Sequence, residues 1–175
     1  GGFLLGVTEA EDAGEFALEL DAKVAVNYRI LKVKTMAEEI TLEVVQSWLD
    51  MSPFIKFTGL EAQSVDKDKG EVVIRMPMRP ELARGADSLD RFHGGPVAAL
   101  VDTVGAFAIA VLVKGRMPTI NFRVDYLRPS TGPYLDARAI VRRVGRTIGV
   151  VDIDVIDSEG NLTSVGRGCY GTQVD

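Results

Sequence analysis

The sequence is poor in the residue types that build disulfides and metal sites, with one cysteine and one histidine among 175 residues. The single cysteine, Cys169, excludes an intrachain disulfide and a metal site made of cysteines, so we expect a small strand residue in a reducing compartment. Basic residues are not in excess either, because the net charge is -5. This acidic balance argues against a nucleic-acid partner, although a local basic cluster could still hold a small phosphorylated ligand.

The sequence also lacks a basic amino-terminal region followed by an apolar run and a cleavage site, so we expect a cytoplasmic location. One long apolar run does occur, at residues 94–113, and it is about as long as a membrane span. Asp102 lies near its centre, where a charge costs roughly 2.5–3.5 kcal/mol in a bilayer. The small residues beside Asp102 and the amphipathic strands that follow favour a buried helix in a soluble protein over a membrane partner.

The length of the chain and its 46% of hydrophobic residues suit one sizeable core. We expect a single domain at residues 36–175, where the periodic patterns lie. Residues 1–35 contain no interpretable motif, and we treat them as an N-terminal extension of unknown role. Ordinary structure and an added extension both remain open for that segment.

Hydrophobic periodicity predicts the order helix, two strands, long helix, four strands. The predicted elements are a short helix that begins at Thr41 and stops at Pro53, strands at 57–66 and 70–78, a long helix at 96–113, and strands at 119–127, 134–143, 149–157 and 162–173. The strand at 119–127 alternates strictly, which predicts one apolar face formed by Ile120, Phe122, Val124 and Tyr126. This order indicates an α+β fold, in which a six-stranded antiparallel sheet curves around one long helix that is apolar nearly all round.

The long helix has a distinctive entrance, in which Gly94 and Gly95 precede Pro96. Proline suits the first helical turn, and glycine allows close approach of another group to the backbone. Free N–H groups and the positive end of the helix dipole could bind a carboxylate, a phosphate or a polarised carbonyl oxygen there. Many helices begin in this way, so the signal is weak by itself.

Asp102 is the second feature of this helix. Its neighbours at helical spacing are small residues such as Ala98, Ala99 and Ala106, which would permit either close packing or a channel for a thin ligand. An unpaired buried carboxylate is costly, so Asp102 is either a site residue or the partner of a backbone group or of Arg123. His93, just before the helix, is interpreted first as a structural hydrogen-bonding residue.

Two stretches, HGGPVAALVD at 93–102 and PTINFRVDYLRP at 118–129, resemble the hotdog-fold acyl-CoA thioesterases of the phenylacetic acid degradation group. In element order the resemblance extends from Ile55 to about Thr172. It implies hydrolysis of an acyl-CoA thioester to a free acid and CoA. It also implies a homodimer or homotetramer with active sites between subunits, and no cofactor or metal.

The resemblance assigns catalytic roles to three residues. The amide of Gly94 would donate to the thioester carbonyl, and Asp102 would act as general base on water or as nucleophile. Thr119 occupies a position where relatives often carry a hydroxyl that helps to place the water or the carboxylate. A thioester carbonyl is already electrophilic, so a carboxylate and one or two backbone donors suffice for this chemistry.

Further residues are candidate substrate contacts. His93 and Gly95 adjoin the helix entrance, and Arg128 and Arg146 are candidates for the phosphate groups of CoA, with solvated strand-face charges as the alternative interpretation. Relatives commonly carry Asn or Gln six residues before the histidine, where this chain has Asp87. An ionised Asp87 cannot donate to an oxyanion and would oppose its charge.

The spacing of Gly94 and Asp102 along the helix limits how they can act together. Gly94 and Asp102 are eight residues apart, which is roughly 12 Å along a helix axis. One carbonyl cannot contact both groups of one helix, so a shared thioester requires Gly94 and Asp102 from different subunits.

The sequence is also compatible with two other functions. A hydratase or dehydratase of the same fold would use His93, and an acyl-CoA-binding module without turnover would fit the departure at Asp87. The fold by itself cannot separate these functions.

Overall fold

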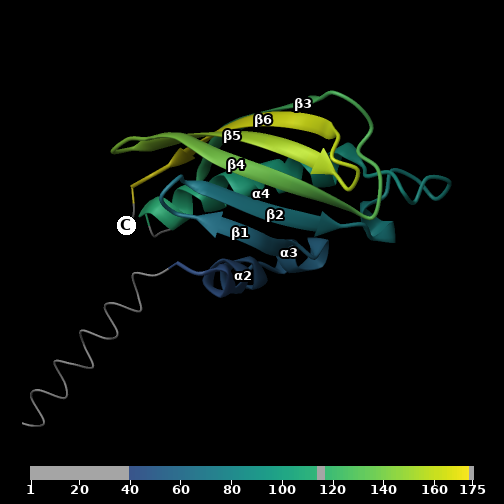
Figure 1. Ribbon diagram of the computed structural model, residues 1–175, viewed down its shortest axis with the longest axis horizontal. Coiled ribbons are helices and arrows are strands. Elements are labelled where there is room, and N and C mark those ends of the chain that lie inside the picture. Colours follow the sequence, from purple (N-terminus) through teal and green to yellow (C-terminus); the bar gives the residue numbers. More distant parts are fainter. Residues whose placement is uncertain (1–39, 114–116, 174–175) are drawn as a thin grey trace, which may run out of the picture. The chain divides into compact units, whose positions relative to one another are not determined.

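The computed structural model describes residues 40–113 and 117–173, and the proposed extension at 1–35 lies outside them. The described chain forms a six-stranded sheet in the order β1-β2-β4-β5-β6-β3, in which all neighbours are antiparallel (Figure 1). The elements are α2 (Leu42–Asp50), α3 (Pro53–Thr58), β1 (Glu61–Asp66), β2 (Glu71–Pro77), the 3-10 turn η1 (Pro80–Leu82), α4 (Gly94–Val113), β3 (Thr119–Tyr126), β4 (Tyr134–Val144), β5 (Ile148–Asp157) and β6 (Leu162–Gly171). The predicted architecture is confirmed.

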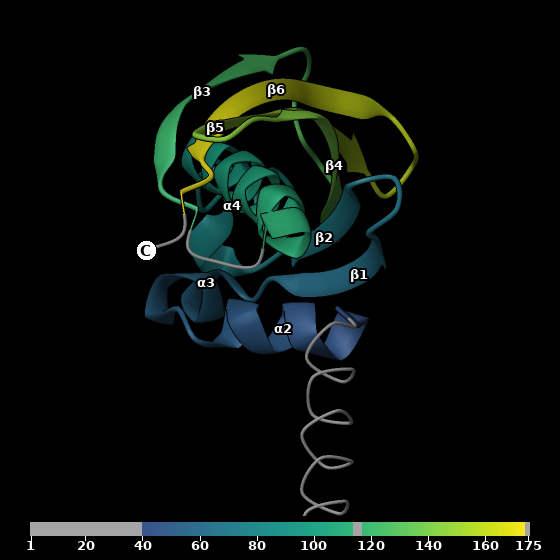
Figure 2. The ribbon, with the colours of Figure 1, turned by 90° about the vertical axis from the view of Figure 1, so that its left-hand side faces the viewer.

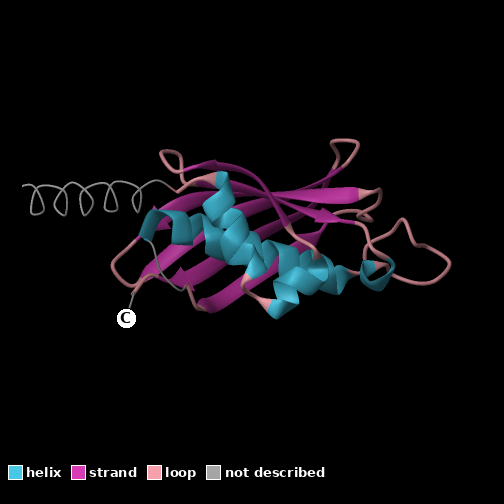
Figure 3. Ribbon diagram, turned by 90° about the horizontal axis from the view of Figure 1, so that it is seen from below, coloured by secondary structure: helices cyan, strands magenta, loops and turns pink. Residues whose placement is uncertain are grey.

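The helices lie on one side of the sheet, as Figure 3 shows. Strands β2, β4 and β5 alternate between buried and partly exposed residues, so each gives one row of side chains to the core. That inner row includes Val72, Ile74 and Met76, as the sequence predicts, together with Leu135, Ala137, Ala139, Val151, Ile153 and Val155.

Helix α4 lies inside the curve of the sheet (Figure 2). It is long and apolar enough to cross a membrane, but half of its most apolar window is buried within the fold. Its buried side chains include Leu100, Val101 and Val104. On the side that the sheet leaves open, Trp48 of α2 meets Phe107 of α4, with 6.3 Å between the ring centroids. The apolar run at 94–113 is therefore the central core helix of this fold.

The helical region before β1 differs from the prediction. Thr41 caps α2 through its hydroxyl, which accepts from the Val44 amide at 3.4 Å, and α2 ends before Pro53. Pro53 then begins a second helix, α3, whose first turn is capped by the Ser52 side chain. Proline fits this first position because it has no N–H to satisfy there. The strand predicted from residue 57 therefore begins only at Glu61.

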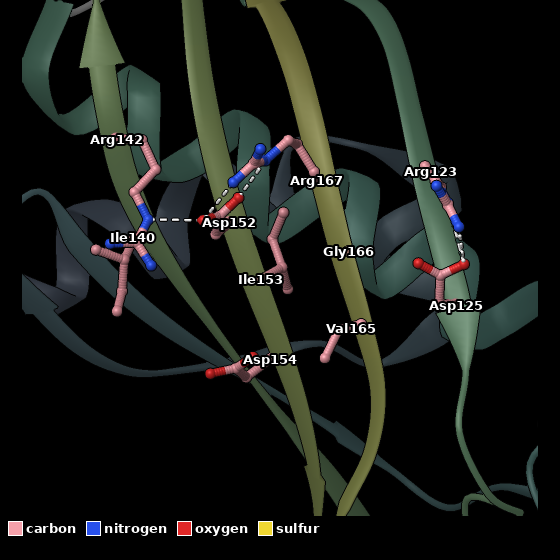
Figure 4. Close-up of a pocket in the computed structure, with 10 residues that line it drawn as sticks. All are labelled: Arg123, Asp125, Ile140, Arg142, Asp152, Ile153, Asp154, Val165, Gly166 and Arg167. Atoms are coloured by element: carbon pink, nitrogen blue, oxygen red, sulfur yellow. Dashed lines mark hydrogen bonds and ion pairs between the residues drawn. The ribbon is translucent and has the colours of Figure 1, made fainter.

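The outer face of the sheet carries ion pairs. On this face Asp152 of β5 accepts from Arg142 of β4 at 2.7 Å and from Arg167 of β6 at 2.5 and 2.8 Å (Figure 4). The Arg167 guanidinium, aided by Arg142, holds the pKa of the Asp152 carboxyl below its ordinary value of 3.8. A hollow of about 390 Å³ lies over these residues, and the sheet separates it from α4.

Strand β3 forms one edge of the sheet, because β6 is its only neighbour in the described chain. Apolar side chains are exposed along and just beyond it: Ile120 (53%), Phe122 (39%), Tyr126 (53%) and Leu127 (53%). An edge with unpaired backbone groups and an apolar surface is suited to pairing with another chain.

Candidate active site

The entrance of α4 is capped by the histidine that precedes it. The Gly95 amide donates to Nδ1 of His93 at 3.0 Å, which makes this ring nitrogen an acceptor and satisfies one of the free donors of the first turn. Pro96 has no N–H to donate. In the described part of the chain, the Gly94 amide has no hydrogen-bond acceptor. Gly94 therefore presents the available main-chain donor at the positive end of the helix dipole.

Tyr126 joins the end of β3 to this entrance. Its hydroxyl donates to the Gly94 carbonyl oxygen at 2.7 Å. A Cβ added at Gly94 would lie about 3.5 Å from the Tyr126 ring, so the two residues are in close contact. The sequence indicates only that Tyr126 belongs to an apolar strand face, because a contact between residues 32 positions apart leaves no local pattern.

A hollow of about 330 Å³ opens beside Gly94. Arg84, Arg91 and Arg128 line it, and none of its lining residues is acidic. Five arginines of the sheet strands are paired with carboxylates, whereas these three form no ion pair within residues 40–113 and 117–173. The Nε of Arg91 is buried and has no acceptor there. The residues that line the hollow thus carry positive charge and no carboxylate.

The structure brings only some of the predicted contacts to this hollow. His93, Gly94 and Arg128 line it, and Arg84 and Arg91 are additions that no motif indicated. Asp87 lies exposed on the loop before α4, where its Oδ1 accepts from the Ser88 hydroxyl at 3.5 Å, and it does not line the hollow. Arg146 lies on the connection between β4 and β5, also outside the hollow.

Asp102 lies two turns further along α4 and is half-buried. The Thr119 hydroxyl donates to its Oδ1 at 2.8 Å. Arg123, the possible ion-pair partner, instead pairs with Asp125 at 2.9 Å. The neighbours Ala98, Ala99 and Ala106 of Asp102 are partly exposed, so the sheet does not cover this side of the carboxylate.

A β-bulge explains how Thr119 reaches Asp102. Thr119 pairs with Tyr170 of β6 and Asn121 pairs with Cys169, which leaves Ile120 without a partner. The extra residue changes the alternation of faces, so Thr119 faces α4 while Asn121 does not. The strict alternation predicted for 119–127 is therefore wrong at its first step. A regular strand would point Thr119 and Asn121 to the same face.

The unbroken helix keeps Gly94 and Asp102 apart. Eight residues of rise separate their backbones by roughly 12 Å. One chain thus supplies a donor at the helix entrance and a carboxylate two turns away, but it does not bring them together. Among the described residues, no three His, Cys, Asp or Glu side chains gather as a metal site would require.

Comparison with known proteins places this arrangement in a family. Residues 90–164 match the thioesterase superfamily. A Halobacterium salinarum protein named as a candidate esterase is 34% identical over 73% of this chain and 89% of its own. The acyl-coenzyme A thioesterase PaaI of Escherichia coli is 32% identical over 59% of this chain and 72% of its own.

Solved structures agree with this placement. A thioesterase from Haemophilus influenzae superposes with a TM-score of 0.67 at 26% identity, covering 76% of this chain and 90% of its own. Escherichia coli PaaI superposes with a TM-score of 0.64 at 25% identity, covering 73% and 89%. The chain therefore belongs to the thioesterase superfamily and has its hotdog fold. Its general activity is thioester hydrolysis.

Proposed function

We propose that the protein is an acyl-CoA thioesterase of the PaaI-like group, which hydrolyses an acyl-CoA to a free acid and CoA. The proposal rests chiefly on the environment of Asp102. This residue is a half-exposed carboxylate on a largely apolar helix, and the Thr119 hydroxyl orients it. The Escherichia coli relative is named an acyl-coenzyme A thioesterase, and its gene is described as part of the phenylacetic acid degradation operon. We place the reaction in the cytoplasm.

The chain's own groups provide a metal-free route. The thioester carbonyl oxygen accepts from the Gly94 amide, which stabilises the negative charge that develops on it. Asp102 takes a proton from water as the water oxygen bonds to the carbonyl carbon. The C–S bond then breaks, and the CoA thiolate leaves and takes up a proton. In the alternative nucleophilic route, the Asp102 carboxylate attacks the carbonyl carbon, the C–S bond breaks and the CoA thiolate leaves and takes up a proton; water then cleaves the mixed anhydride, which releases the acid and regenerates Asp102.

This route needs two copies of the chain. Gly94 and Asp102 of one helix are too far apart to act on one carbonyl, so each must meet its counterpart from another subunit. The exposed apolar residues of β3 and its free edge supply a surface where a second β3 strand could pair. We propose a homodimer with two shared sites, assembled as such or within a homotetramer.

The arginine-lined hollow supports the choice of a CoA ester. Arg128, with Arg84 and Arg91, offers unpaired guanidinium groups next to the helix entrance. Guanidinium binds phosphate oxygens through two parallel hydrogen bonds, so an acyl ester that carries phosphate groups suits this hollow better than a neutral ester. We propose that these three residues contact phosphate groups of the substrate.

The test is release of free thiol from a panel of short, aromatic and long acyl-CoAs. We expect Asp102→Asn to lower kcat by about 100-fold or more, which is the usual contribution of a general base. Asp154→Asn, a matched change on the outer face of β5, should leave kcat unaltered. Equal rates for wild type and Asp102→Asn would remove Asp102 from the mechanism.

The same panel separates the two other functions. Tight acyl-CoA binding without thiol release would identify a binding module. Hydration of an enoyl-CoA would identify a hydratase, although the acceptor role of His93 Nδ1 toward the Gly95 amide already occupies one nitrogen of that ring.

A further inference from the structure

The side chain of Tyr170, on β6, reaches the backbone of Asp102. Its side chain is completely buried, and its hydroxyl donates to the main-chain oxygen of Asp102 at 3.1 Å. Burial raises the pKa of Tyr170 far above its ordinary value, and the Asp102 carboxylate raises it further. The hydroxyl therefore stays protonated and remains a donor throughout the pH range in which an enzyme of this kind works.

Two glycines make room for this tyrosine. A Cβ at Gly105 of α4 or at Gly168 of β6 would overlap the Tyr170 hydroxyl oxygen. The ring can therefore approach the helix backbone closely, at a point less than one turn from Asp102. A larger side chain at either glycine would have to displace the tyrosine or the helix.

Tyr170 and Thr119 face each other in the register of β3 and β6. Their hydroxyls reach the same helical residue, Thr119 at the carboxylate and Tyr170 at the main-chain carbonyl. A hydrogen bond to the backbone limits rotation and sliding of α4 against the sheet, and a hydrogen bond to the carboxylate limits the side-chain rotamer. Together they restrain both the backbone position and the side-chain rotamer of Asp102.

We propose that Tyr170 is a positioning residue, which acts with Thr119 to hold the Asp102 carboxylate in the geometry that thioester hydrolysis requires. This inference rests on the proposed function of Asp102. The inference goes beyond that function by assigning a role to a buried residue that contacts neither the substrate nor the reacting atoms. A misplacement of about 1 Å can cost up to 100-fold in rate, so a bond that fixes the helix matters for catalysis.

The direct test is Tyr170→Phe, which removes the hydroxyl and keeps the ring. We expect kcat to fall about tenfold with KM changed less than twofold, because the loss of one hydrogen bond moves the base and leaves the substrate contacts in place. The effects of Tyr170→Phe and Thr119→Val should be non-additive in the double variant, since both residues act on Asp102. An unaltered kcat in folded Tyr170→Phe would overturn the proposal.

Thr172→Val is the matched control. Thr172 also uses a buried hydroxyl to bond a main-chain oxygen, that of Gly145 at 2.8 Å, but this bond leads away from α4. Its loss should lower the thermal stability without lowering kcat. An equal loss of kcat in Thr172→Val would mean that any buried hydroxyl in this part of the chain has the same effect, which would also overturn the proposal.

A crystal structure of Tyr170→Phe gives a readout that does not depend on activity. We expect the Thr119–Asp102 hydrogen bond, 2.8 Å in the wild type, to be broken or lengthened beyond hydrogen-bonding distance. If that bond is retained, the positioning role is wrong, whatever the kinetics. If the wild type hydrolyses no thioester, the proposed function fails, and the state of this bond alone decides whether Tyr170 positions Asp102.

Discussion

At the scale of single residues, the arrangement around Asp102 leaves one of its oxygens available. Oδ1 accepts from Thr119, whereas Oδ2 accepts no hydrogen bond from the described residues. A general base needs this combination, because one oxygen fixes the orientation while the other can take a proton. The neighbouring main-chain contact from Tyr170 leaves both oxygens untouched.

Of the two arginines that the sequence suggests for the CoA phosphates, Arg128 lines the hollow and Arg146 does not, and this difference gives a residue-scale prediction. Arg128→Ala should raise KM for an acyl-CoA about tenfold with little change in kcat, since a charge-assisted bond to phosphate is lost. Arg146→Ala should raise KM much less, because Arg146 lies outside the hollow.

The measurement is steady-state kinetics with an acyl-CoA and with the matching acyl-pantetheine, which has no phosphate groups. The effect of Arg128→Ala should disappear with acyl-pantetheine. Equal effects on both substrates would show that Arg128 does not contact phosphate.

The sequence predicts the site residues that stand out within one segment, and it does not predict those whose contacts join segments far apart in the chain. Asp102 and Gly94 stand out because a lone carboxylate in an apolar helix and a glycine at its entrance are visible within one segment. Thr119 was indicated by family resemblance. The sequence does not indicate Tyr170, because only the folded sheet brings it to Asp102. It does not indicate Arg84 and Arg91 either, because only the fold gathers them with Arg128 around one hollow. The departure at Asp87 suggested a weakened carbonyl site, but the structure places Asp87 away from the hollow.

At the scale of elements, alternation and helical spacing predict eight of the described helices and strands, because each of them buries apolar side chains. They do not predict α3, since Pro53 suits both the end of one helix and the first turn of the next. They also miss the bulge at Ile120, because a bulge is a property of the pairing between β3 and β6 and not of β3 alone. That bulge is what turns Thr119 toward α4.

The ion pairs across β4, β5 and β6 give an element-scale prediction. Asp152→Asn should lower the free energy of unfolding at neutral pH by about 1 kcal/mol, because the partly exposed carboxylate joins two arginines in a small network. Asp154→Asn, two residues further along the same face, breaks no ion pair of the described residues and should change stability less.

The effect of Asp152→Asn should depend on pH. The pKa of Asp152 in the folded protein is below its ordinary value of 3.8, chiefly because Arg167 hydrogen-bonds to the charged form. The stabilisation is therefore present above that ordinary value and is lost as the pH falls through the lowered one. Urea unfolding at decreasing pH should show wild type and Asp152→Asn converging in acid. A constant difference between them would contradict the assigned role of the carboxylate.

At the scale of the whole molecule, one subunit contains every proposed catalytic group and yet no complete site. The helix entrance and Asp102 lie on the same helix but roughly 12 Å apart, and β3 has one free edge. A two-fold pairing of subunits would create two identical sites, each with the Gly94 amide of one chain and the Asp102 carboxylate of the other. The proposed route therefore requires assembly of at least two chains.

Mixed dimers test this arrangement directly. Gly94→Pro removes the proposed amide donor at a position where proline fits the first helical turn, and the Tyr126 ring leaves room for its Cβ. Gly94→Pro and Asp102→Asn should each be inactive as homodimers. In a dimer purified with one chain of each kind, one site carries both defects and the other carries neither. We expect about half of the wild-type activity from that dimer, because one of its two sites is intact.

If Gly94 and Asp102 served the same site within one chain, every site of the mixed dimer would carry one defect. Thiol release by the purified mixed dimer would then stay at the level of the inactive homodimers. The measurement distinguishes the two cases without knowledge of the natural acyl group, since any acyl-CoA that the wild type hydrolyses can serve as substrate. Recovery of activity therefore requires that the carboxylate of one chain act at the helix entrance of its neighbour.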